Sequence, residues 1–155
     1  IYMDGCEDED FKLLVEFNEN VHMFDELIHI GGNLHYDASG TTVDGRTARI
    51  ELKKRDFAVS QYQTLFIEDH KSANLFYDYF VFKDEPLYIN FLHDGIAVFN
   101  LRRVTKRPEV IIGRSKTKGY GGYEYNSRNS LYVQDAAIYN NNYKLVQIPL
   151  WKQQQ

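Results

Sequence analysis

The sequence predicts an α/β (α+β) domain in which a central mixed sheet is flanked by helices. Apolar residues near the start recur at helical spacing, and β-rich segments further on are separated by turns that contain Asp-Gly. A second helical stretch lies between these strands, and the order helix, strands, helix, strands is typical of this class. Because no linker-like segment divides the chain, residues 1–155 are expected to form one domain.

The composition excludes several classes of protein. Hydrophobic residues make up 43% of the chain, with 12 Tyr and 10 Phe, which is enough for a core and argues against disorder. The single cysteine, Cys6, cannot form an internal disulfide, and no C-x-x-C or H-x-x-x-H pair offers a structural zinc site. No apolar run approaches the roughly 18 residues of a membrane span. The start is acidic and lacks the pattern of a signal peptide, so a cytoplasmic protein with no membrane partner is expected.

The first elements expected are a helix and a hairpin. The helix runs from Asp8 to about Ile28, because its apolar positions follow helical spacing and its first acids suit the helix dipole. The segments 33–38 and 46–55 read as strands, and Val43-Asp44-Gly45 between them is a turn signal.

The rest of the chain is expected to hold one more helix and several strands. The helix runs from Ser60 to about Tyr77, and His93-Asp94-Gly95 is a second turn signal. The region 104–129 is interrupted by glycines and is expected to be irregular. The expected strands cover residues 79–82, 86–92, 96–101, 131–133 and 144–149.

The strand 46–55 carries the residues most able to perform chemistry. Alternate side chains of a strand share a face, so Glu51, Lys53 and Arg55 point one way while Ile50 and Leu52 point into a core. A carboxylate there can bind a hard cation, and a lysine beside it can orient or polarise a water molecule. This chemistry suits metal-assisted hydrolysis of a phosphate ester. An ordinary half-exposed strand with an ion pair on its face would have the same pattern.

A metal site needs a second carboxylate, and hairpin register selects Asp37 over Asp44. Asp44 lies in the turn, roughly 20 Å from Glu51 along an extended strand. With a three-residue loop, Thr42 pairs with Arg46, and Asp37 then lies directly opposite Glu51 on the same face. A loop shorter by one residue would turn Asp37 to the other face.

This ordered set of residues resembles the core of the PD-(D/E)xK nuclease superfamily. The likeness covers roughly residues 10–101 and is closest to small nuclease-like proteins of phages and mobile elements. It rests on Asp37, Glu51-Leu52-Lys53-Lys54-Arg55, Phe66-Ile67-Glu68-Asp69-His70-Lys71 and Leu87-Tyr88-Ile89-Asn90-Phe91. The resemblance implies a restriction-endonuclease-like core. The chain departs from the family pattern where Tyr36, rather than proline, precedes Asp37.

The resemblance also implies roles for the site residues. Asp37 and Glu51 would bind Mg²⁺ (or Mn²⁺) together with the Leu52 carbonyl, and Lys53 would assist the attacking water. A further acid from the first helix is expected, with Glu16 as the candidate and Glu19 next. A plain surface position is the alternative for both acids.

Three cations are candidates for contacts with nucleic-acid phosphates. Lys54 and Arg55 adjoin the metal site, and Lys71 lies on the second helix, which in similar proteins faces the cleft. Lys71 could also form a surface ion pair with Glu68. In addition, residues 102–118 carry seven bases against one acid, a candidate surface for a polyanion, whereas residues 1–28 carry nine acids against one base.

The function predicted from the resemblance is a metal-dependent nuclease that hydrolyses phosphodiester bonds, most plausibly of DNA. One alternative is a catalytically inactive domain of the same fold that binds nucleic acid or a protein partner. Another is an unrelated α+β domain with a coincidental E-x-K. The aromatic C-terminal segment through Trp151 is a candidate face for a homodimer or part of the core.

Overall fold

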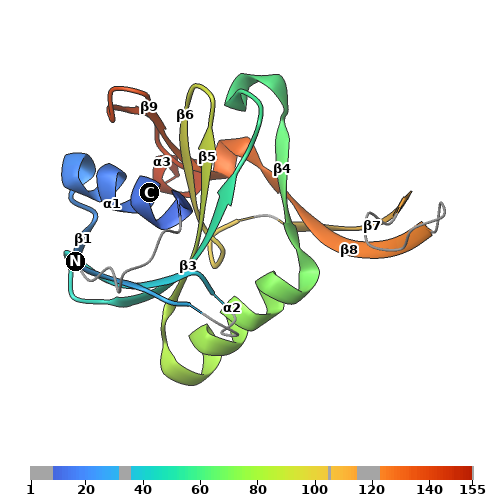
Figure 1. The fold of residues 1–155 in the computed structure, drawn as a ribbon, viewed down its shortest axis with the longest axis horizontal. Helices are drawn as coiled ribbons and strands as arrows, with labels where there is room; N and C mark the ends of the chain where they lie inside the picture. The colour runs from blue at the N-terminus through green and yellow to red at the C-terminus, as the bar shows by residue number, and fades with distance from the viewer. Residues whose placement is uncertain (1–8, 32–35, 105, 115–122, 155) are drawn as a thin grey trace.

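The computed structural model describes residues 9–31, 36–104, 106–114 and 123–154, and its main feature is a seven-stranded mixed sheet (Figure 1). The strand order across this sheet is β1-β2-β3-β5-β6-β9-β10. The pair β3 and β5 is parallel and the other neighbouring pairs are antiparallel. The strand bounds are β1 Phe24–His29, β2 Ala38–Thr42, β3 Thr47–Lys54, β5 Glu85–Leu92, β6 Gly95–Asn100, β9 Ala137–Asn140 and β10 Leu145–Gln147.

A smaller sheet of three strands has the order β4-β8-β7, with β4 Thr64–Glu68, β7 Lys106–Arg114 and β8 Tyr123–Tyr132. The β7–β8 hairpin extends away from the body of the molecule (Figure 1). The helices are α1 Glu9–Val21, α2 Asp69–Phe82 and α3 Leu150–Gln153, and short 3-10 turns lie at Val59–Gln61 and Val133–Asp135. No helix among the described residues is long and apolar enough to cross a membrane.

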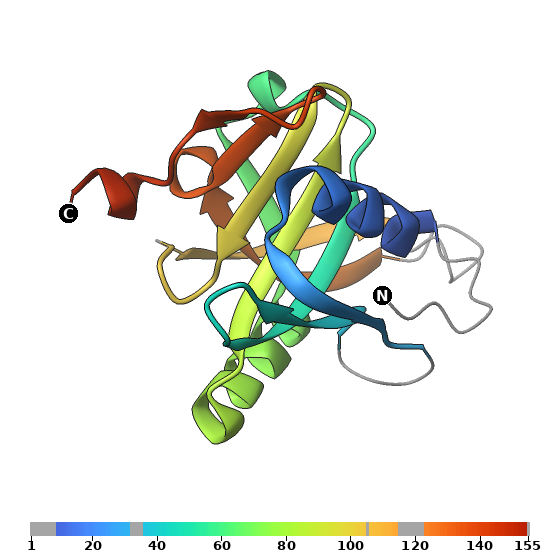
Figure 2. The ribbon, with the colours of Figure 1, turned by 90° about the vertical axis from the view of Figure 1, so that its left-hand side faces the viewer.

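The two faces of the large sheet are covered by different elements. Helix α1 crosses one face (Figure 2), where its buried Phe11, Leu14 and Phe17 join a core cluster with Ile50 and Leu52 of β3. On the other face, residues of β4, α2 and β8 form a second cluster with β5 and β6. The predicted class, a central mixed sheet flanked by helices, is therefore confirmed.

The hairpin register is the one that the sequence predicts. Ala38 pairs with Ile50 and Thr41 with Thr47, and the Thr42 amide donates to the Arg46 carbonyl at 2.8 Å. Gly45 has a φ of +88°, which a glycine in a tight turn adopts without strain. The first strand of the hairpin begins at Ala38 rather than earlier, and of the segment expected to precede it residues 33–35 lie outside the described part of the chain.

The expected first helix is too long. It ends at Val21, because His22 takes a left-handed φ of 56° and the Asn18 side chain bonds both the amide and the carbonyl of Phe24. Strand β1 follows, with a register shift between Phe24 and Glu26. The extra residue puts Phe24 and Leu27 on the buried side three residues apart, which imitates helical spacing.

Three further expectations are wrong. The segment 60–77 is not one helix: β4 comes first, with Leu65 and Ile67 buried in strand alternation, and α2 begins only at Asp69. The strand expected at 79–82 is the last turn of α2, which ends where Lys83 adopts a φ of 62°. The region expected to be irregular contains β7 and β8, because their ladder pairs distant residues that local pattern cannot identify. Strands 86–92 and 96–101 are confirmed as β5 and β6.

Candidate metal and phosphate site

Asp37 and Glu51 meet where β2 begins beside the middle of β3. The Asp37 amide donates to the Ile50 carbonyl at 3.0 Å, which holds Asp37 against β3 just before β2 begins. Its carboxylate turns back to the neighbouring strand, and Oδ2 accepts a hydrogen bond from the Leu52 amide at 2.8 Å. The Asp37 carboxyl is close enough to Glu51 to be, after burial, one of the causes that raise the pKa of Glu51. The two acids that register selects are therefore neighbours.

The Glu51 side chain is only 5% exposed, and this burial sets its titration. Burial is the largest cause that raises the pKa of Glu51 to about 7. The hydrogen bond from Lys71 opposes that rise, and the adjacent Asp37 carboxylate adds to it. The Glu51 carboxyl can consequently gain or lose a proton near neutral pH.

Helix α2 contributes Lys71 to the same place. Its Nζ lies 2.7 Å from Glu51 Oε1, and the side chain is about one-third exposed. Burial disfavours the charged ammonium, but the contact with Glu51 outweighs burial and raises the pKa of Lys71. The sequence leaves Lys71 either facing the cleft or paired with Glu68 on the surface, and in the structure its ion pair is with Glu51.

Lys53 lies two residues after Glu51 on the same face of β3 and is half-buried. It lines a small cavity with Glu51, Glu68 and Lys71, whose volume of about 10 Å³ is close to the space that one water molecule needs. The cavity brings together the carboxyl groups of Glu51 and Glu68 and the ammonium groups of Lys53 and Lys71.

The same strand face continues to Arg55, but the structure corrects the expectation that Arg55 is an exposed cation. Its residue is 7% exposed, and its guanidinium donates to Asn90 Oδ1 at 3.1 Å, to the Tyr88 hydroxyl at 2.9 Å and to the Phe66 carbonyl. These contacts join β3 to β5 and β4 behind the cavity. Burial raises the pKa of Tyr88 to about 12, so this hydroxyl stays protonated.

The parallel register places Tyr88 beside Glu51 and Asn90 beside Lys53. Reasoning from the sequence missed this support. The alternation of polar Tyr88 and Asn90 with Leu87, Ile89 and Phe91 is its signal, because a buried strand with polar residues at every second position needs partners for them.

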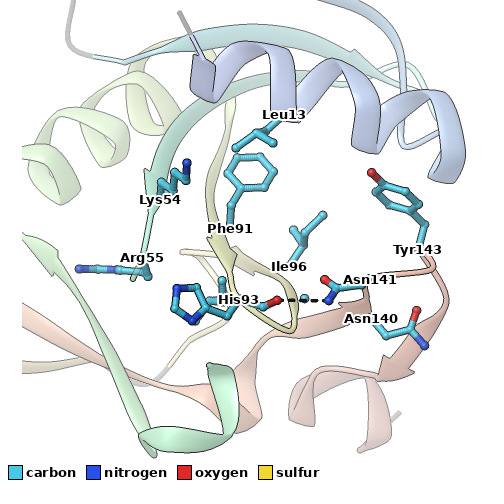
Figure 3. A pocket seen from close by; sticks show the side chains of 11 residues that line it. Leu13, Lys54, Arg55, Phe91, His93, Ile96, Asn140, Asn141 and Tyr143 are labelled. Atoms are coloured by element: carbon cyan, nitrogen blue, oxygen red, sulfur yellow. Dashed lines mark hydrogen bonds between the residues drawn. The ribbon is translucent and has the colours of Figure 1, made fainter. Parts of the chain in front are cut away.

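Lys54 and Glu16 lie on the opposite face of the sheet from Glu51, against expectation. Because side chains alternate along β3, Lys54 points to the α1 side, where it lines a cavity of about 200 Å³ with Leu13 and Tyr143 (Figure 3). Glu16 is exposed on α1, and its nearness contributes, after burial, to the raised pKa of Tyr143. The buried side of α1 packs on the sheet, so neither Glu16 nor the exposed Glu19 reaches the carboxyl pair.

The residues present fit a magnesium ion. Within the described ranges no group of three or more His, Cys, Asp or Glu side chains could hold a metal, and Asp37 and Glu51 are two acids that lie close together. Mg²⁺ commonly binds one or two carboxylates and completes its shell with water or substrate phosphate. In a strand, the amide and carbonyl of one residue point to the same side, so the Leu52 carbonyl faces the edge at which its amide meets Asp37.

The structure describes only part of the basic cluster 102–118. Arg102 contacts Glu85 at 3.4 Å and the Tyr79 hydroxyl at 3.2 Å, and the Arg103 guanidinium lies over the Trp151 ring. Lys106, Arg107 and Arg114 lie on β7, whereas Lys116 and Lys118 fall outside the described residues. Arg102 at least therefore forms contacts within the protein itself.

Comparison with known proteins gives a likeness to solved structures and none to a protein family or a curated protein. No model of a protein family and no curated protein matches the chain. Among solved structures, the chain is similar to Hjc, a Holliday junction resolvase from the archaeal hyperthermophile Archaeoglobus fulgidus. The two share 18% sequence identity with a TM-score of 0.47 over 76% of this chain and 77% of that one.

Proposed function

We propose that this chain is a metal-dependent nuclease that hydrolyses phosphodiester bonds of DNA. The observation that carries the proposal is the closeness of the Asp37 and Glu51 carboxyls beside Leu52, with Lys53 on the same strand face. Carboxylates brought together out of water are costly unless a proton or a cation compensates them. A divalent cation is the partner whose chemistry also supplies hydrolysis of a phosphate ester.

In this proposal the residues of the site have separate roles in binding the metal ion and in positioning water and phosphate. Asp37 and Glu51, with the Leu52 carbonyl, would hold Mg²⁺ or Mn²⁺, which when bound stabilises charge on the phosphate and lowers the pKa of a bound water. The Lys53 ammonium would orient the attacking water or hold the phosphate oxygen. The Leu52 amide fixes the Asp37 carboxylate, so that this acid is oriented before any ligand arrives.

Lys71 has a second role in this proposal. In the absence of a divalent cation its ammonium compensates Glu51 at 2.7 Å, and a metal ion would replace it there. The displaced ammonium, one-third exposed and carried by α2, would then be available to a substrate phosphate. Lys53 and Lys71 are therefore the cations proposed to meet the backbone of DNA at the cavity.

The Glu51–Lys71 ion pair also favours a second candidate function, a domain of this fold that binds nucleic acid without cutting it. A lysine that stays on Glu51 would satisfy the buried acid permanently and leave no place for a metal ion. The two candidates differ in turnover and not in binding.

The test is cleavage of linear, circular and single-stranded DNA with Mg²⁺ or Mn²⁺ against EDTA. Wild type is expected to cut only with metal, and Glu51→Gln and Asp37→Asn are expected to lose cleavage while keeping the fold. Glu26→Gln, which removes an exposed carboxylate from β1, is the matched control and should cut as wild type does. Full-rate cutting by Glu51→Gln would refute the site, and binding without cutting would favour the second candidate.

A further inference from the structure

Three cavities follow one another along β4 and the residues just before it, and each shares one aromatic residue with the next. We call the small cavity at Glu51, Lys53 and Lys71 the catalytic cavity, after the proposed function, and the next two the middle and the outer cavity. The catalytic and middle cavities share Phe66, and the middle and outer cavities share Tyr62. Tyr132 lines the outer cavity and Phe57 the middle one. We call Phe57, Tyr62, Phe66 and Tyr132 the aromatic track. It begins at Glu51 and Lys71 and leads away from them.

The middle cavity combines aromatic surfaces with one cation. Its volume is about 260 Å³. The Phe57 and Tyr62 rings meet edge to face with centroids 4.7 Å apart, and Tyr62 is 50% exposed. The Arg128 guanidinium lies over the Phe66 ring, 4.3 Å from its centroid, and the hydroxyls of Thr64 and Ser130 complete the lining.

Phe66 joins this cavity to the catalytic one. The buried Arg55 guanidinium lies 4.4 Å from the Phe66 ring centroid and is hydrogen-bonded to the Phe66 carbonyl. Arg55 lines the catalytic cavity but not the middle one, and Arg128 lines the middle cavity but not the catalytic one. The Phe66 ring is thus held between two guanidinium groups and separates the two spaces at a fixed position.

The outer cavity is larger and neutral. Its volume is about 540 Å³, and Tyr62, Tyr132, Gln63 and Gln134 are among its lining residues. Neither the middle nor the outer cavity has an Asp or Glu among the described residues that line it. Phenol rings, amides and hydroxyls offer both flat faces and hydrogen bonds, and the charge along the track comes from Arg128.

These are the features with which proteins bind unpaired nucleotides. Aromatic rings stack on the faces of bases without regard to sequence, and a cation accompanies the backbone. The bases of a duplex are stacked on one another inside the helix, so their faces are closed to such rings. An aromatic track beside a site for phosphate therefore selects a strand whose bases are free.

We propose that the aromatic track binds unpaired bases of a DNA strand that enters the catalytic cavity, so that the substrate is single-stranded DNA or DNA with a single-stranded branch. The identification of a phosphate-cleaving site at the end of the track rests on the proposed function. Stacking of bases at Tyr62 and Phe66 does not, because it requires neither metal nor turnover.

The experiment measures fluorescence anisotropy of a labelled dT oligonucleotide about 12 nucleotides long, in EDTA, against a duplex of equal length. Wild type is expected to bind the single strand more tightly. Tyr62→Ala should weaken that binding about tenfold, and Tyr62→Phe, which keeps the ring, should bind within about twofold of wild type. Tyr77→Ala removes an exposed tyrosine from α2 that lines none of the three cavities, and should change nothing.

Arg128→Gln provides a second variant, which should weaken the single-strand affinity and lower its salt dependence by about one ion. Unchanged single-strand binding by both Tyr62→Ala and Arg128→Gln would overturn the proposal, as would equal losses on duplex, or tighter binding of the matching RNA. If the protein cuts DNA with metal but Tyr62→Ala binds single strands as wild type does, the role of the aromatic track is refuted and the proposed function is not. Tyr62-dependent binding without cutting would support the track and refute the proposed function.

Discussion

Burial of Glu51 makes the stability of this fold fall as pH rises through neutrality. Below an unfolded-state pKa of 4.5 the carboxyl is protonated in both states, and above about 7 it is charged in both. Between these values the folded chain binds more protons than the unfolded chain, so the free energy of unfolding decreases with pH. The interval from 4.5 to about 7, at 1.36 kcal/mol for each pH unit, corresponds to about 3 kcal/mol.

The measurement is urea denaturation in EDTA between pH 5 and pH 8, with wild type and Glu51→Gln compared at each pH. The difference between the two proteins isolates Glu51, because histidines and other groups titrate in both. Wild type is expected to lose about 3 kcal/mol relative to Glu51→Gln across this range. Excess Mg²⁺ at pH 8 should restore stability to wild type but not to the variant, since a ligand that binds only the folded state stabilises it. Identical pH profiles for the two proteins would refute the reasoning.

Three other substitutions test the contacts around the site. Lys71→Met removes the partner of Glu51 and should cost about 1 kcal/mol at pH 8 but little at pH 5, where Glu51 is protonated; equal urea midpoints at pH 8 would contradict this. Arg55→Lys keeps the charge but loses the planar fork that reaches Asn90, Tyr88 and Phe66, and urea unfolding should show a loss of about 2 kcal/mol. Gly95→Ala would place a Cβ 2.3 Å from the Tyr139 carbonyl oxygen and should lower the Tm by roughly 4–8 °C, whereas Gly31→Ala, whose nearest contact is 3.6 Å, should not.

The part of the site that lies within one hairpin could be predicted from the sequence. Asp44-Gly45 specifies a turn, the flanking segments alternate as strands do, and the loop length then fixes the register that pairs Ala38 with Ile50, next to Asp37 and Glu51. All of these signals are local, so no knowledge of distant partners is needed. The same reasoning identified strands β5 and β6 around the turn at His93 and Asp94.

The other parts of the site could not be predicted, because they depend on contacts between segments that are distant in the sequence. Arg55 looks like a surface cation in the sequence, and only the position of β4, which brings the Phe66 carbonyl to it, makes it a buried one. Lys71 meets Glu51 because α2 begins at Asp69, after a strand that the helical spacing had concealed. The expectation that Glu16 joins the metal site is wrong for a related reason, because the spacing of apolar residues along a helix does not reveal which face of the sheet the helix covers.

The turn of three residues between β2 and β3 also bears on how such a protein can change in evolution. Surface turns are ordinarily where insertions and deletions accumulate, because few contacts depend on them. Here one added residue between Thr42 and Arg46 would shift β2 along β3 and carry the Asp37 carboxylate to the opposite face of the sheet, away from Glu51. Descendants that keep the carboxyl pair are therefore expected to vary the identity of the turn residues while preserving their number.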